Sequence, residues 1–109
     1  MMMMVDPELD ALRREFLTEA CEKMQEIAKA LGSDRDAAAL ERVSYLAHQL
    51  KGSGGSYGFQ RISTDAAELE KAIERLTGGL PDGAEDEIQK RVGSLRSEID
   101  QRTRELAGM

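Results

Sequence analysis

The stretch HQLKGSGGSYG, residues 48–58, contains the single histidine of the chain, a lysine and four glycines. Because glycine costs up to about 1 kcal/mol relative to alanine inside a helix, the stretch by itself is typical of a loop. The apolar residues around it nevertheless keep a helical spacing: Ala39, Val43, Leu46, Leu50 and Tyr57. We therefore expect one helix over residues 36–57 that continues through the glycines and ends at Gly58.

Three further helices are predicted by the same periodicity, over residues 7–31, 59–77 and 84–107. Gly32 follows the first as a C-cap, and TGGLPDG at residues 77–83 separates the last two. The residues expected to point inward are Leu9, Leu12, Phe16, Ala20, Met24, Ile27 and Leu31 in the first helix, Phe59, Ile62, Ala66, Leu69, Ile73 and Leu76 in the third, and Ile88, Val92, Leu95, Ile99 and Leu106 in the fourth.

Four amphipathic helices joined by short connections predict an all-α fold, an antiparallel up-down-up-down four-helix bundle. The 109 residues suit one domain with one core. We assign residues 6–109 to the bundle and expect residues 1–5, MMMMV, to be flexible. Since the bundle can cover the single apolar stripe of each helix, we expect a monomer.

The overall charge and the single cysteine restrict the partners and the compartment. The formal net charge of −6 argues against nucleic acid and anionic membranes, which attract clustered Lys and Arg. Cys21 cannot form an internal disulfide, which favours a reducing compartment, the cytoplasm. The apolar run at the N-terminus is too short for a signal peptide, and no stretch reaches the roughly 18 apolar residues of a membrane span.

Helical geometry places His48 on the solvent side of its helix. At about 100° per residue, Leu46 and Leu50 lie about 160° from His48, and Val43 about 140°. The residues that share the face of His48 are Glu41, Ser44, Tyr45, Lys51, Gly52 and Gly55. Lys51 follows three residues later, so its side chain can reach the same patch.

The glycines beside His48 are costly and therefore need a reason. Gly52, Gly54 and Gly55 together cost up to about 3 kcal/mol relative to alanine. Gly54 falls near the inward side, where close packing on a neighbouring helix explains it. Gly52 falls outward beside His48, where the close approach of another molecule's backbone explains it.

The pattern around the histidine extends into the third helix. It consists of His48, Leu50, Lys51, Gly52, Ser53, Gly58 and Glu70. This pattern resembles the histidine-containing phosphotransfer (HPt) domain, and GSYGF at residues 55–59 looks like the corresponding segment of chemotaxis histidine kinases. The resemblance covers about residues 8–107 and is strongest in residues 43–73. The pair Gly54-Gly55 departs from it, because at least one other small residue is common there.

The resemblance implies a reaction in which His48 accepts a phosphoryl group from an aspartyl phosphate, or returns it. It implies attack by Nε2, with Glu70 accepting a hydrogen bond from the protonated Nδ1 and Lys51 pairing with the phosphoryl oxygens. Gly52 would leave room for the partner. Mg²⁺ would be required by the partner receiver domain, and we expect no cofactor and no metal site in this chain.

The implied partners are receiver domains of response regulators and of a hybrid histidine kinase, between which the chain would act as a phosphorelay intermediate. The residues expected to form the docking surface are Ser44, Tyr45, Gly52 and Gly55, with Leu17 of the first helix adding apolar contact. Two alternatives remain open. In the first alternative the chain is the phosphotransfer domain of a chemotaxis-type kinase, and in the second it is a non-catalytic helical adaptor.

Other site classes fit the residues less well. KGSGGS reverses the order of a P-loop, and Tyr57 occupies the third glycine position of a dinucleotide motif that would begin at Gly52. A Cys-His hydrolase would need Cys21, which belongs to another helix and has no recognisable oxyanion loop. We therefore expect no ATP site, so the chain would pass phosphate on without generating it.

Overall fold

The computed structural model describes residues 7–33 and 35–108. They form four helices, α1 (Pro7–Gly32), α2 (Ala37–Ser56), α3 (Gln60–Thr77) and α4 (Ala84–Ala107), and this part of the chain contains no strand. The predicted all-α class is confirmed. The expectation of a flexible segment at residues 1–5 concerns residues outside the described part. None of the described helices is long and apolar enough to cross a membrane.

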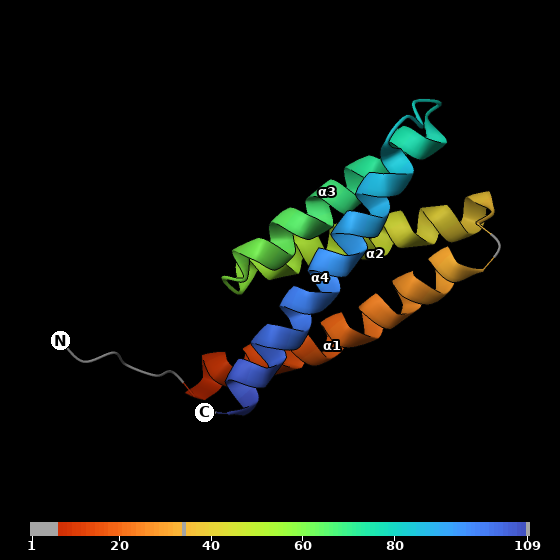
Figure 1. Ribbon diagram of the computed structural model, residues 1–109. Coiled ribbons are helices and arrows are strands. Elements are labelled where there is room, and N and C mark those ends of the chain that lie inside the picture. The colour runs from red at the N-terminus through yellow and green to blue at the C-terminus, as the bar shows by residue number, and fades with distance from the viewer. Residues whose placement is uncertain (1–6, 34, 109) are drawn as a thin grey trace.

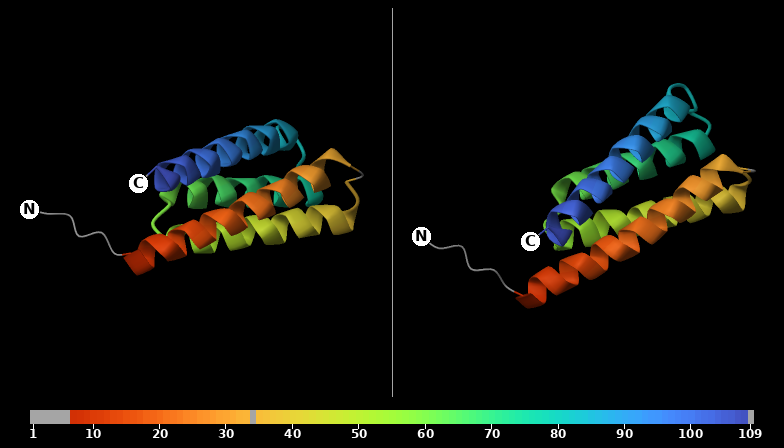
Figure 2. Two further views of the ribbon diagram at one scale, coloured as in Figure 1. Left: turned by 90° about the horizontal axis from the view of Figure 1, so that it is seen from below. Right: turned by 60° about the horizontal axis from the view of Figure 1, so that its bottom comes forward.

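The helices pack as a bundle in which successive helices run in opposite directions (Figures 1 and 2). Each helix contacts two neighbours: α2 lies against α1 and α3, and α4 lies against α3 and α1. The core between them is apolar and is made by Phe16, Leu17, Ala20, Met24, Ile27, Leu31, Val43, Leu46, Ala47, Leu50, Ile62, Ala66, Leu69, Ala72, Ile73, Ile88, Leu95 and Ile99. Burial of these stripes is the main stabilising term of such a fold.

Helix α2 begins and ends as the sequence predicts. The carboxylate of Asp36 caps it by accepting a hydrogen bond from the Ala39 amide at 2.8 Å. The helix continues through the glycines to Ser56, and Gly58 then takes a positive φ of 84° that few other residues adopt. The glycine-rich stretch is therefore helix, and the turn is confined to its end.

Aromatic rings fix the turn between α2 and α3. The ring of Phe16 lies 5.5 Å from that of Tyr57 and 5.6 Å from that of Phe59, measured between centroids. Arg13 Nε donates to the Tyr57 carbonyl at 3.1 Å. These contacts hold the C-terminal end of α2, and the turn that follows it, against α1.

The glycine at position 54 allows α2 and α3 to approach closely. A Cβ atom there would lie only 3.2 Å from both Ile62 Cγ2 and the Ser63 amide nitrogen. This confirms the prediction that Gly54 packs against a neighbouring helix. Gly55 also faces α3, since its Cβ position lies 3.5 Å from Ser63 Oγ, so it is less outward than predicted.

The buried face of α1 is rotated relative to the predicted one. Leu12, predicted to be inward, is 45% exposed, whereas Leu17, predicted to be a docking residue, is 1% exposed. Viewed down the axis of α1, at about 100° per residue, the buried residues span an arc whose centre lies about 50° from Phe16. Leu17 lies about 50° from this centre, at the edge of the arc, and Leu12 lies about 90° from it, outside the arc. The prediction for Leu17 is therefore wrong, because its side chain belongs to the core.

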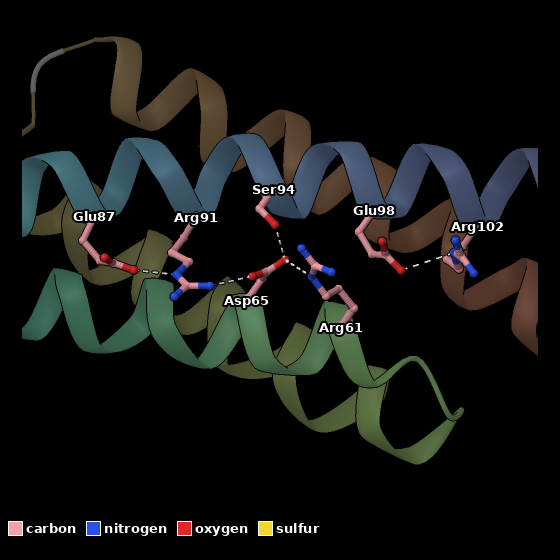
Figure 3. Close-up of polar contacts among 7 residues, drawn as sticks. All are labelled: Arg61, Asp65, Glu87, Arg91, Ser94, Glu98 and Arg102. Carbon is pink, nitrogen blue, oxygen red and sulfur yellow. Dashed lines mark hydrogen bonds and ion pairs between the residues drawn. The ribbon is translucent and has the colours of Figure 1, made fainter.

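A buried carboxylate joins α3 to α4 (Figure 3). Asp65 is 1% exposed and accepts hydrogen bonds from Arg91 Nη1 at 2.9 Å and Ser94 Oγ at 2.6 Å, with Arg61 Nε at 3.8 Å. Glu87 and Asp65 together raise the pKa of Arg91 by hydrogen bonding. A buried charge is tolerated only with such partners, so this group fixes how α3 lies on α4.

Candidate functional site: an exposed histidine on α2

The side chain of His48 is exposed near the middle of α2. It is 63% exposed, while the residues of α2 that are buried lie on the other side: Val43, Leu46, Ala47, Leu50 and Gly54. The predicted outward position of the imidazole is therefore confirmed. It follows from the helical period, which keeps residue 48 away from the apolar stripe.

Glu70 of α3 holds one nitrogen of this ring. Its Oε2 lies 3.0 Å from His48 Nδ1, and its side chain is only 17% exposed. An ionised carboxylate can only accept a hydrogen bond, so the proton of the neutral imidazole is placed on Nδ1. Nε2 then carries the lone pair, which makes it the nucleophilic atom of the exposed ring.

Lys51 shares the same carboxylate. Its Nζ lies 3.8 Å from Glu70 Oε1, and its side chain is 45% exposed. The ammonium group therefore lies on the α3 side of the ring. An exposed ion pair of this kind is weak, so it can exchange partners when a more strongly charged group arrives.

The backbone next to the ring is bare. A Cβ atom at Gly52 would meet no atom within 4 Å. Ser63 Oγ donates to the Lys51 carbonyl at 2.8 Å and ties α3 to α2 at this level. Sequence reasoning did not find Ser63, since a serine on a helix carries no signal of its partner.

The sequence model of the Hpt domain matches residues 11–105, which is nearly the whole chain. The chain belongs to the Hpt domain family. Its function class is therefore histidine-containing phosphotransfer in two-component signalling, and Hpt domains interact with receiver domains in phosphorelays. Searches of curated proteins and of solved structures gave no significant match.

Among the expected docking residues of this Hpt domain, Tyr45 presents a large side chain to solvent. It is 52% exposed, its hydroxyl accepts a hydrogen bond from Gln49 Nε2 at 2.8 Å, and the Arg42 guanidinium lies 5.5 Å from the ring centroid. Ser44 is half-buried. Leu17 is excluded from the surface by its burial.

An open hollow borders His48 on the side of α1. Its volume is about 480 Å³, and its lining is formed by Lys23, His48, Gln49, Gly52, Ser53, Ser56 and Tyr57. Lys23 and Gln49 were not among the predicted site residues. Charge and exposure alone do not distinguish Lys23 from the other lysines of the sequence.

The geometry does not support the Cys-His alternative. Cys21 Sγ lies 4.0 Å from Thr103 Oγ1 of α4, whereas His48 contacts Glu70 of α3. Within residues 7–33 and 35–108, no three or more His, Cys, Asp or Glu side chains are grouped as metal ligands.

Proposed function

We propose that this Hpt domain is a phosphorelay intermediate that accepts a phosphoryl group on His48 from the aspartyl phosphate of one receiver domain and passes it to another. The observation that carries the proposal is the exposed imidazole whose Nδ1 is held 3.0 Å from Glu70 Oε2. This contact fixes the tautomer and leaves Nε2 available to attack.

The transfer step needs no cofactor bound to this chain, because every bond and proton is accounted for by His48 and the aspartyl phosphate. The Nε2 lone pair attacks phosphorus, the bond from phosphorus to the aspartyl oxygen breaks, and the aspartate leaves as a carboxylate. The Nδ1 proton stays on the ring, which becomes cationic, and the carboxylate of Glu70 stabilises that charge. The reverse step regenerates an aspartyl phosphate on the next receiver domain.

Lys51 would contact the incoming phosphoryl group, and Gly52 would face the receiver domain that carries this group. The Lys51 ammonium already lies beside the ring and would exchange its weak contact with Glu70 for the phosphoryl oxygens, a charge-assisted contact. The open space at Gly52 would admit the backbone of the receiver domain. Mg²⁺ would be held by the acidic site of that partner. Tyr45, Ser44 and Gly55 would lie within the docking surface.

The test uses the purified chain and a radiolabelled, phosphorylated receiver domain from the same genome. We expect an acid-labile, base-stable label on the wild type and none on His48→Gln, because glutamine has no nucleophilic ring nitrogen. Lys90→Gln on α4, away from the site, serves as a control and should label normally. A label that survives in His48→Gln, or an unlabelled wild type across the receiver domains of the genome, would refute the proposal.

A second candidate is the phosphotransfer domain of a chemotaxis-type kinase. It is favoured by the likeness of residues 55–59 and by the contact between Glu70 and His48, which is the arrangement the resemblance implies for those kinases. Labelling of His48 by ATP in the presence of a separate kinase domain, with no labelling by receivers, would select this function. A helical adaptor would give no label in either experiment.

The compartment and the oligomeric state are part of the same proposal. A cytoplasmic location is supported by the unpaired thiol of Cys21. A monomer is supported by the apolar stripes, which α1 to α4 bury against one another inside the bundle. Gel filtration with light scattering checks the monomer.

A further inference from the structure

The side of His48 that faces α3 and the side that faces α1 present different groups to the imidazole. On the α3 flank, Glu70 binds Nδ1 and also holds Lys51. The two nitrogens of an imidazole point in diverging directions, so Nε2 is directed away from Glu70 and from α3. A phosphoryl group on Nε2 would therefore extend towards solvent and the α1 flank, where the hollow of about 480 Å³ lies.

Lys23 is the cationic residue in the lining of that hollow. Its position follows from the ion pair between Glu26 of α1 and Arg42 of α2, at 2.6 Å, which places these residues at the same level. Lys23 precedes Glu26 by about one turn of α1. Because α1 and α2 run antiparallel, Lys23 lies beside the next turn of α2, at the height of Tyr45 along the bundle axis. Helical side chains lean towards the N-terminus, which on α1 directs Lys23 further along α2, towards Gln49.

The ammonium group of Lys23 has no competing partner in the described part of the chain. No ion pair joins it to Glu19, one turn earlier on α1, and the carboxylate of Glu26 is engaged by Arg42. Its side chain is half-buried against the hollow, which restricts where the ammonium can go. By contrast, Lys51 is shared with Glu70.

We propose that Lys23 is a second cation that binds the phosphoryl group of phosphorylated His48, from the α1 flank, while Lys51 acts from the α3 flank. This inference rests on the proposed function. The two ammonium groups would approach different phosphoryl oxygens, and Lys23 would hold the group in the hollow beside Gln49 and Ser53. The α1 helix would then contribute directly to the site, in addition to supporting α2.

The experiment measures phosphorylation of the whole chain by phosphoramidate, a small donor that needs no docking surface. His48 Nε2 attacks phosphorus, the phosphorus–nitrogen bond of the donor breaks, and ammonia leaves. The variants are Lys23→Gln and, as a matched control on the same helix, Lys29→Gln, whose side chain is exposed near the end of α1. The labelling rate is measured at low and high ionic strength.

We expect Lys23→Gln to label about fivefold more slowly than the wild type at low salt, which is the effect of one exposed cation near a phosphate. The deficit should shrink at high salt, because exposed charges are screened, and Lys29→Gln should behave as the wild type does. A rate for Lys23→Gln equal to that of Lys29→Gln would overturn the role of Lys23. So would a deficit that is independent of salt, which would indicate a structural effect.

The failure of this inference can be told apart from failure of the proposed function. If the wild type labels on His48 and Lys23→Gln labels equally well, only the role of Lys23 is refuted. If phosphoramidate labels neither protein, or labels His48→Gln as well, the phosphoacceptor role of His48 is refuted and the role of Lys23 with it.

Discussion

The substitution Gly52→Ala is predicted to stabilise the fold while it slows phosphotransfer. A Cβ atom at this position meets nothing within 4 Å, so the methyl group has no steric cost in the free protein. The helix gains about 1 kcal/mol, since alanine loses less backbone entropy than glycine. For a domain of about this size, that gain raises the unfolding temperature by roughly 4 °C or more.

The neighbouring glycines provide matched controls for this argument. In Gly54→Ala the new methyl group would lie 3.2 Å from Ile62 Cγ2 and from the Ser63 amide, and the backbone nitrogen cannot move alone. We expect a net loss of about 1–2 kcal/mol, because overpacking outweighs the gain in helix propensity. Gly55→Ala makes only an ordinary contact at 3.5 Å with Ser63 Oγ, so it should keep the gain in helix propensity and be stabilised by up to about 1 kcal/mol.

The assays separate stability from docking. Urea and thermal unfolding followed by circular dichroism give the free energies of the three variants. The initial rate of transfer from a phosphorylated receiver domain to Gly52→Ala should fall by about tenfold, which corresponds to about 1.4 kcal/mol of lost contact. Labelling by phosphoramidate should change less than twofold, because this small donor brings no backbone against residue 52.

Two results would refute the reasoning. If Gly52→Ala lowers the free energy of unfolding, the space around residue 52 is not open. If Gly52→Ala is stabilised but receives phosphate from the receiver domain at the wild-type rate, then no partner backbone approaches this glycine, and its presence beside His48 needs another explanation.

Three more outcomes follow from the contacts of the carboxylates. Glu70→Gln should label at least about tenfold more slowly with phosphoramidate, since a neutral amide stabilises the cationic ring less well, and an unchanged rate would contradict the role of Glu70. Asp65→Ala should lose about 2–3 kcal/mol in urea unfolding because it leaves Arg91 without a buried partner, and a loss below about 1 kcal/mol would show that the group contributes little. Hydrogen bonding from Arg35 lowers the pKa of Glu85 from 4.5, so the folded protein binds fewer protons there than the unfolded chain. This stabilisation is complete above the unfolded pKa and is lost as the pH falls through the lowered value, so Glu85→Gln should be less stable than the wild type at neutral pH and the gap should narrow in acid. An equal gap at every pH would contradict this assignment.

The sequence determined the helices and the outward position of the histidine. Helix bounds at Asp36, Gly58 and residue 84 were predicted within about one residue, because caps, glycines and apolar spacing act within a few residues of the chain. The exposure of His48 followed from the same local period. The acidic partner was identified only through the family resemblance, since nothing in the pattern itself distinguishes Glu70 from its helical neighbours.

The rotation of α1 about its own axis was decided by the tertiary structure. Leu12 is exposed although it was predicted to be buried, and Leu17 is buried although it was predicted to be exposed. Both residues lie near the edges of one apolar arc, and only the packing of α1 on α2 and α4 selects which edge is covered. Asp65 was missed for a related reason. Its charge is typical of a surface position, and only Arg91 and Ser94 on α4 make its burial possible.

The assembled site also depends on contacts between helices. The approach of α3 to α2 at Gly54 brings Glu70 within reach of Nδ1, and the level of α1 on α2 brings Lys23 to the hollow beside His48. A helical pattern specifies the direction of a side chain around its own axis, whereas the distance between two side chains on different helices depends on how all of the buried residues pack together.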